Sequence, residues 1–177
     1  MKLNLGCRNR PIPGFTGMDC DAHDGVDIVG DISDLSQFES DAVEEIYASH
    51  VLEHFPHTQT LAVLAEWCRV LKKGGKLYLA VPDFDATMDI ARSSGLSEWV
   101  RNYLWGDQKY KTAFHYAGFD EIGLSAMLKD VGFTEIERAE RLAMTPTPDC
   151  SDLAIRAKTA SGKEKIISVS LNLIGTK

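Results

Sequence analysis

RVLKKGGKLYLAVPD, residues 69–83, is the segment from which the fold of this sequence is most easily inferred. Residues 76–81 are almost continuously apolar, as in a strand that is covered on both faces, and Pro82 ends the run. Just before this strand, apolar residues recur with a 3.6-residue period, at Leu61, Leu64, Ala65, Cys68 and Leu71. The segment therefore predicts an amphipathic helix that runs into a buried strand.

Further apolar runs extend this pattern in both directions. Six segments have the length and turn-bounded character of strands: residues 3–5, 15–18, 26–29, 45–49, 133–137 and 169–173. A second helix is predicted over residues 120–131, capped by Asp120, with one face formed by Ile122, Ala126, Met127 and Val131. Because strands and helices alternate along the chain, we expect a mostly parallel sheet with helices on its faces.

Composition limits the function classes. The 177 residues suit one domain, and the net charge of −7 disfavours a nucleic-acid partner. No apolar run is long enough to span a membrane, and the N-terminus lacks a signal peptide, so we expect a cytoplasmic protein. The cysteines form no C-x-x-C pair and so suggest neither a disulfide framework nor a zinc knuckle: Cys7, Cys20, Cys68 and Cys150.

Polar residues and a glycine follow the predicted strands, where an open parallel sheet binds its ligands. Gly6 comes after the first strand and lets a ligand approach the backbone closely. Asp19 follows the second strand and can accept both hydroxyls of a ribose, whereas Asp31 follows the third and suits the amino edge of an adenine. Together these three strand ends predict a nucleoside site.

Four linked segments resemble the class I S-adenosylmethionine-dependent methyltransferases, most closely the small bacterial type 11 group. They read LNLGCRNRPIPGFTGMDCD, VDIVGDISDL, VEEIYASHVLEHF and EWCRVLKKGGKLYLAVPD, and span residues 3–83 in order. The resemblance implies a single α/β domain over residues 1–177, with a Rossmann-like, doubly wound, mostly parallel seven-stranded sheet. It also implies S-adenosylmethionine as cofactor and a small-molecule acceptor, such as a sugar, a lipid or a secondary metabolite.

The resemblance assigns roles to individual strand-end residues. Gly6 and Cys7 correspond to the loop that contacts the methionine part of the cofactor, and Asp19 corresponds to the ribose-binding acid. The positions that correspond to the adenine contacts are Asp31 and Ile32, and those beside the sulfur and methyl are Ser49 and His50.

The sequence departs from this family at its N-terminal end. Arg8 replaces the second glycine of the usual G-x-G loop, where a positive φ would cost energy. The short span from Gly6 to Asp19 leaves little room for the usual first helix, and the N-terminus is truncated at the first strand. A homodimer or a partner subunit could cover this open side. An alternative function is therefore a catalytically inactive, methyltransferase-like binding subunit, although the retained acids disfavour it.

Three residues are candidates for a catalytic base: His50, Asp83 and His115. His50 to His54 also fits the H-x-x-E-H pattern of inverted zinc metallopeptidases. That chemistry needs both histidines on one helical face, whereas His50 is predicted at a strand end. We therefore expect no metal site from this motif.

Residues 85–119 form a long segment between the fifth strand and the second helix. It is rich in aromatic residues, and we interpret it as an inserted helical flap. Its part from Gly95 to Phe114 is predicted to act as a lid over the acceptor. Residues 145–165 carry no clear pattern.

Overall fold

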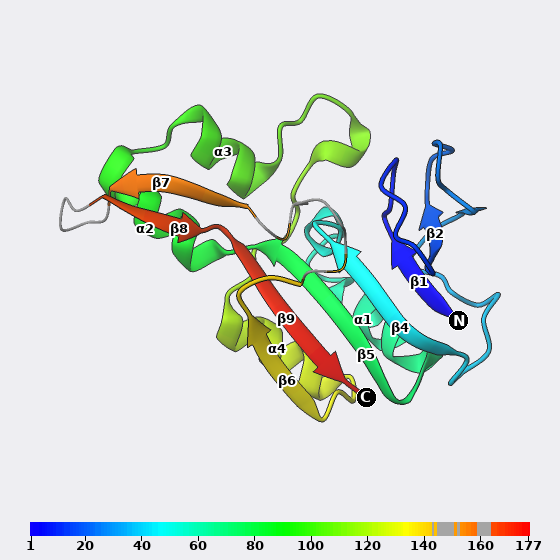
Figure 1. Ribbon diagram of the computed structural model, residues 1–177. Coiled ribbons are helices and arrows are strands. Elements are labelled where there is room, and N and C mark those ends of the chain that lie inside the picture. The colour runs from blue at the N-terminus through cyan, green and yellow to red at the C-terminus, as the bar shows by residue number, and fades with distance from the viewer. Residues whose placement is uncertain (143, 145–150, 152, 159–163) are drawn as a thin grey trace.

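A seven-stranded sheet forms the centre of the protein (Figure 1). The computed structural model describes residues 1–142, 144, 151, 153–158 and 164–177. The strand order is β3-β2-β1-β4-β5-β9-β6, and β9 alone runs antiparallel to its neighbours. These strands are β1 (Lys2–Leu5), β2 (Thr16–Asp19), β3 (Ile28–Val29), β4 (Val43–Ser49), β5 (Leu71–Pro82), β6 (Glu135–Ala139) and β9 (Ser170–Thr176). The mostly parallel seven-stranded sheet predicted above is confirmed.

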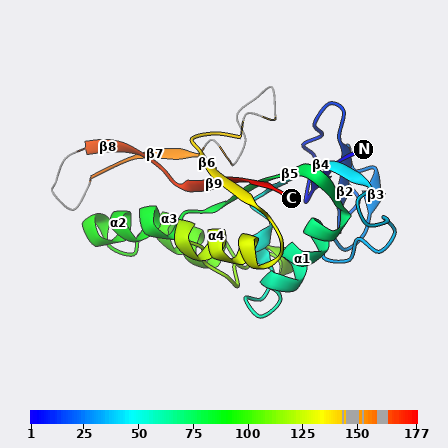
Figure 2. The same cartoon turned by 90° about the horizontal axis from the view of Figure 1, so that it is seen from below.

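The α-helices lie on one side of the sheet (Figure 2). They are α1 (Thr60–Val70), α2 (Phe84–Ser94), α3 (Glu98–Trp105) and α4 (Glu121–Asp130). This differs from the expectation of helices on both faces, because the short connections from β1 to β2 and from β2 to β3 contain no helix. Loop residues instead pack around Tyr47 on the other face: Ile12, Phe15, Leu142 and Met144.

The buried faces of α1 and α4 differ in part from those predicted, although Leu64 and Cys68 of α1 are buried as expected. Leu61 is 47% exposed and Ile122 is 86% exposed, although both were expected to face the core. In α1 the face is centred on Trp67, whose buried indole Nε1 donates a hydrogen bond to the carbonyl of Ile32 at 2.8 Å. In α4 the core residues are Leu124 and Leu128, which are four residues apart. Periodicity alone could not choose between two overlapping apolar stripes.

Strand β5 starts at Leu71, earlier than the predicted Lys76, and follows α1 directly. Two glycines permit this tight start. Gly74 has a φ of +76°, and a Cβ on Gly75 would come within 2.8 Å of the Lys72 carbonyl oxygen. The glycine pair therefore lies within the strand, at a place where neighbouring backbone atoms leave no room for a Cβ on Gly75, and it does not simply end the helix.

Two inserted segments pack together beyond the end of the sheet. Helices α2 and α3 form the first, and an antiparallel hairpin of β7 (Ala154–Lys158) and β8 (Glu164–Ser168) forms the second (Figure 1). Ile90 and Val100 of the helices share a small core with Ile155 and Ile167 of the hairpin. The unassigned segment 145–165 thus contains a strand pair, while residues 145–150, 152 and 159–163 lie outside the described residues. No helix in the described part of the chain is long and apolar enough to cross a membrane.

Candidate functional site

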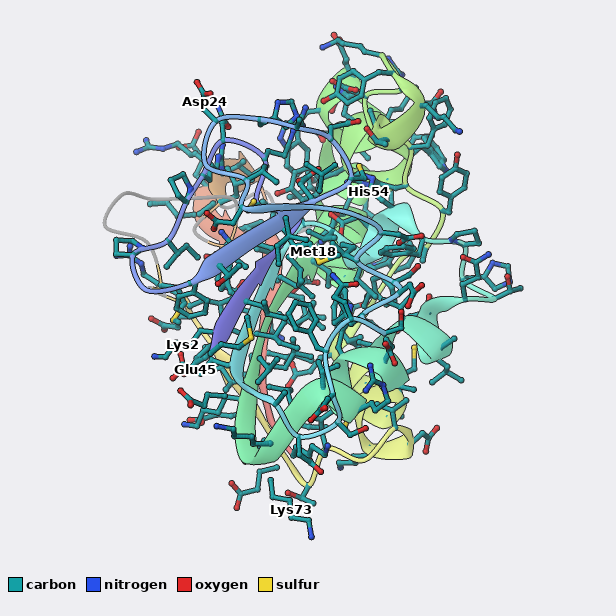
Figure 3. The ribbon with its side chains drawn as sticks, turned by 90° about the vertical axis from the view of Figure 1, so that its right-hand side faces the viewer. Lys2, Met18, Asp24, Glu45, His54 and Lys73 are labelled. Atoms are coloured by element: carbon teal, nitrogen blue, oxygen red, sulfur yellow. The ribbon has the colours of Figure 1, made fainter. Side chains whose placement is uncertain are left out.

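Two hollows lie at the carboxyl ends of the parallel strands. Figure 3 shows His54 near this end, while Lys2, Glu45 and Lys73 mark the opposite end of the sheet. The strand-end hollow, of about 560 Å³, is lined largely by residues at or just after the ends of strands, such as Asp19, Asp31 and Ile32. The flap hollow, of about 590 Å³, lies against α3 and the loop that follows it. The two hollows share five lining residues: Gly6, Arg8, His50, His54 and Thr112.

Gly6 turns the chain sharply at the end of β1. Its φ is +68°, and its amide donates to the carbonyl of Met18 at 2.8 Å. A Cβ at this position would lie 2.4 Å from Cγ2 of Val51. The common wall of the two hollows therefore requires glycine here.

Arg8 connects the glycine loop to the flap. Its φ is +44°, so the positive φ considered from the sequence is present. Its backbone amide donates to Oδ2 of Asp19 at 2.9 Å, and its Nη1 donates to the Tyr110 hydroxyl at 3.0 Å. The guanidinium carbon also lies 5.4 Å from the centre of the Tyr110 ring. Arg8 thus spans both hollows and fixes one residue of each.

Asp19, Asp31 and Ile32 line the strand-end hollow, as expected for cofactor contacts. Asp19 is 6% exposed, and its Oδ1 accepts from the Asp21 amide at 3.2 Å. Oδ1 of Asp31 accepts from the amide of Ser33 at 2.8 Å, which orients that exposed carboxylate. The indole of Trp67 holds the carbonyl of Ile32, so α1 positions this loop.

Cys7 and Ser49, the other predicted cofactor contacts, line the flap hollow instead. The Cys7 thiol is buried, and burial together with the nearby Asp19 charge raises its pKa to about 11. It is therefore a protonated, unreactive thiol near neutral pH. Oγ of Ser49 is buried and has no hydrogen-bond partner among the described residues.

His50 lies on the wall common to both hollows. Its φ is +54°, an uncommon conformation for a residue with a side chain. Its Nε2 lies 2.8 Å from the Ser170 hydroxyl, and its Nδ1 lies 3.3 Å from Oε1 of Glu53. The ring is thereby oriented at both nitrogens.

The structure separates the other two base candidates. His115 lines the flap hollow, where burial lowers its pKa below the ordinary value despite the opposing effect of Glu53. Asp83 lines none of the described hollows. It caps α2 by accepting from the Ala86 amide at 3.0 Å, and its other oxygen pairs with Arg138 at 3.0 Å. His50 and His115 thus lie at the hollows, whereas Asp83 does not.

Sequence reasoning missed a cluster of Glu53, His54 and His115. One potential ligand atom of each lies within 4.8 Å of those of the other two. Glu53 and His54 belong to the short helix η1 (Leu52–His54). The H-x-x-E-H spacing was a signal, but it pointed to His50 rather than to the distant His115.

The comparisons with known proteins agree with this architecture. Residues 18–79 match the family described as a methyltransferase domain. No curated protein sequence matches the chain. The family match covers β2 to most of β5, the part that provides Asp19, Asp31 and His50.

Solved structures of low sequence identity share the fold. An S-adenosylmethionine-dependent methyltransferase from Archaeoglobus fulgidus aligns with a TM-score of 0.63 at 13% identity, over 99% of this chain and 85% of that one. A Thermotoga maritima structure, described as a possible histamine N-methyltransferase, gives 0.61 at 17% identity, over 99% and 81%. A Haloferax volcanii methyltransferase, solved with the Trm112 activator, gives 0.58 at 17% identity, over 99% and 80%. The predicted class I methyltransferase fold is confirmed.

Proposed function

We propose that this chain, which carries a methyltransferase domain in a class I methyltransferase fold, binds S-adenosylmethionine and methylates a small molecule. One observation carries the proposal: two hollows of similar size meet at a wall formed by Gly6, Arg8 and His50. The strand-end hollow takes the cofactor and the flap hollow takes the acceptor. Because the nucleophile must reach within about 3–3.5 Å of the methyl carbon, the transfer would take place where the two hollows adjoin, beside these residues.

The residues of the strand-end hollow fit the cofactor. A volume of about 560 Å³ is within the range of pockets for molecules of this size. Asp19 presents a buried carboxylate to ribose hydroxyls, and Asp31 with Ile32 presents an acceptor edge to the adenine. Ser49 adds a buried hydroxyl that has no hydrogen-bond partner in the described part of the chain, which suits a polar group of the methionine part that extends toward the flap hollow.

When bound, the cofactor supplies an electrophilic methyl group on a sulfonium. The residues of this chain hold the acceptor's nucleophile in line with that methyl group and exclude water. His50 is the base candidate that lines both hollows, and Glu53 orients its ring at Nδ1. Its Nε2 would take the proton from an acceptor hydroxyl or amine in exchange for its contact with the Ser170 hydroxyl. His115 lines the flap hollow but not the strand-end hollow. The carboxylate of Asp83 is already used to cap α2 and to pair with Arg138.

The lining of the flap hollow indicates an acceptor with a ring and polar substituents. Trp99 and Tyr103 are stacked, with ring centroids 4.5 Å apart, and Tyr110 forms another part of the wall. Asn102 and Asp107 add polar groups beside them. Among sugars, lipids and secondary metabolites, a sugar or a ring-bearing metabolite matches this mixture best.

Calorimetry with S-adenosylhomocysteine, followed by an acceptor screen that measures release of this product, tests the proposal. We expect saturable binding by the wild type and turnover with at least one ring-bearing hydroxyl or amine compound. Binding without turnover on any acceptor would favour the binding-subunit alternative. A wild-type protein that binds neither form of the cofactor would contradict the methyltransferase function.

The binding-subunit alternative keeps one specific observation in its favour. Arg8 occupies the glycine loop with a φ of +44° and bonds to Tyr110, so the loop is constrained by a side chain where the family usually has a second glycine. The fold neighbour from Haloferax volcanii was solved with an activator protein. A homodimer or partner that relieves this constraint would raise cofactor affinity, which calorimetry in its presence measures directly.

A further inference from the structure

Glu53, His54 and His115 meet between η1 and the segment that follows α3. Each offers one potential ligand atom within 4.8 Å of the others. The Tyr116 amide donates to the Glu53 carbonyl at 2.8 Å, so the two segments are joined by backbone beside the cluster. The three side chains are therefore held together by the fold rather than by chance proximity of long side chains.

Glu53 is the unusual member of this cluster. It is completely buried, and neither carboxylate oxygen forms a hydrogen bond with the described residues. Its nearest ion-pair partner is Nδ1 of His50, 3.3 Å from Oε1. A fully buried carboxylate whose oxygens lack hydrogen-bond donors is costly unless a cation binds to it.

Both histidines are oriented as metal ligands usually are. Nδ1 of His54 lies 2.9 Å from the carbonyl oxygen of Phe114, and Nδ1 of His115 lies 2.9 Å from that of Tyr103. A carbonyl can only accept, so each Nδ1 carries a proton, and Nε2 of each ring is the nitrogen left for another partner. Metal-binding histidines in proteins commonly donate their second ring nitrogen to a backbone carbonyl in this way.

We propose that Glu53, His54 and His115 bind one divalent transition-metal ion such as Zn²⁺. A set of two imidazoles and one carboxylate is typical of zinc sites that keep a fourth position for water or substrate. Both histidines line the flap hollow, so an oxygen atom from that hollow is available to complete the coordination.

This ligand set differs from the one that the H-x-x-E-H motif suggests. The motif pairs His50 with His54, but Nε2 of His50 is already beside the Ser170 hydroxyl. The structure brings His115 to the position of the second histidine instead. The inference revises the expectation of no metal, and it does not depend on cofactor binding, because none of the three residues is assigned to hold the cofactor.

Metal titration of the full chain, treated first with a chelator and without cofactor, tests the inference. We expect one equivalent of Co²⁺ to bind with visible d–d absorption, and Zn²⁺ to displace it. Glu53→Gln and His115→Asn should each lower the affinity by more than roughly 100-fold, since loss of a direct ligand should exceed loss of an outer-shell partner. His57→Ala removes an exposed histidine close in sequence and should leave the affinity unchanged.

Three results would overturn the inference. They are failure of the wild type to bind a stoichiometric ion, unchanged affinity in both ligand variants, and a thiolate charge-transfer band, which would place the ion on cysteine. If a variant does not fold, X-ray absorption spectroscopy of the zinc-loaded wild type identifies the ligand atoms instead. A shell of nitrogen and oxygen with imidazole scattering supports the site, whereas sulfur or an all-oxygen shell contradicts it.

Discussion

The strand-end hollow and the flap hollow differ in how the chain builds them. The first is lined by residues at the ends of three neighbouring strands: Gly6 just after β1, Asp19 as the last residue of β2, and Asp31 shortly after β3. The second gathers residues from β1 to the start of β7, among them Trp99 of α3 and Leu153. Topology fixes the first hollow, because parallel strands end at one edge of the sheet. Packing between inserted segments fixes the second, so the two should respond differently to substitution.

Gly106→Ala should have the largest effect and should act on the flap hollow. A Cβ there would lie 1.8 Å from the Ala113 carbonyl oxygen, and the backbone conformation, with φ 76° and ψ 167°, is one that only glycine adopts readily. We expect a cost of about 2–6 kcal/mol from strain and overpacking together. Amide hydrogen exchange should show lost protection over residues 98–115, while the affinity for S-adenosylhomocysteine stays within about threefold.

Gly95→Ala is the matched control, because Gly95 has a similar backbone conformation but open space at the Cβ position. It should show only the strain, about 1–3 kcal/mol. Equal effects of the two substitutions would mean that the contact with Ala113 does not matter.

Asp19→Asn should have the next largest effect and should act on the strand-end hollow. It keeps the shape and one acceptor oxygen but removes the charge that we propose faces the ribose. We expect S-adenosylhomocysteine to bind more weakly by about 1.5–3 kcal/mol, roughly 10- to 150-fold. Calorimetry measures this, with the exposed Asp24→Asn as control. Unchanged affinity would remove Asp19 from the proposed site.

The difference between the hollows also explains what the sequence could predict. Each strand-end residue follows an apolar run, so its position is readable once the run is recognised, and five of the seven predicted cofactor contacts line the expected hollow. Helix faces were less predictable, as Ile122 shows, because two apolar stripes overlapped. The contact of Arg8 with Tyr110 and the cluster with His115 join segments far apart in the chain. No local pattern encodes such pairs.

Arg8 is the residue that couples the two hollows, and two substitutions separate its roles. Arg8→Gly and Arg8→Ala both remove the guanidinium contact with Tyr110, but only glycine relieves the positive φ. We expect the glycine variant to be more stable than the alanine variant by about 1 kcal/mol. In both variants the amide hydrogens of residues 107–112 should exchange faster than in the wild type. Thermal unfolding and hydrogen exchange measure the two effects, and equal stabilities would show that the loop carries no strain.

The smallest expected effect is a dependence of stability on pH that originates beside the flap hollow. The folded pKa values of His115 and Glu53 are both lowered, so the unfolded chain binds more protons and stability falls on acidification. The contribution of His115 is complete above its ordinary pKa of 6.5 and is lost below it, and that of Glu53 is lost below 4.5. With a chelator present, we expect the melting temperature of the wild type to fall between pH 7.5 and 5.5. His115→Asn should reduce this fall, whereas His57→Ala should leave it unchanged.

Trp67 and Trp99 give each hollow its own optical reporter. The indole of Trp67 is fully buried and bonded to the carbonyl of Ile32, at the rim of the strand-end hollow. Trp99 is stacked on Tyr103 in the flap hollow. Emission from Trp67 should be blue-shifted and shielded from iodide, so a change in it would report a ligand at Ile32. With Trp105→Phe removing the 45% exposed third tryptophan, fluorescence could follow the filling of each hollow separately and in real time.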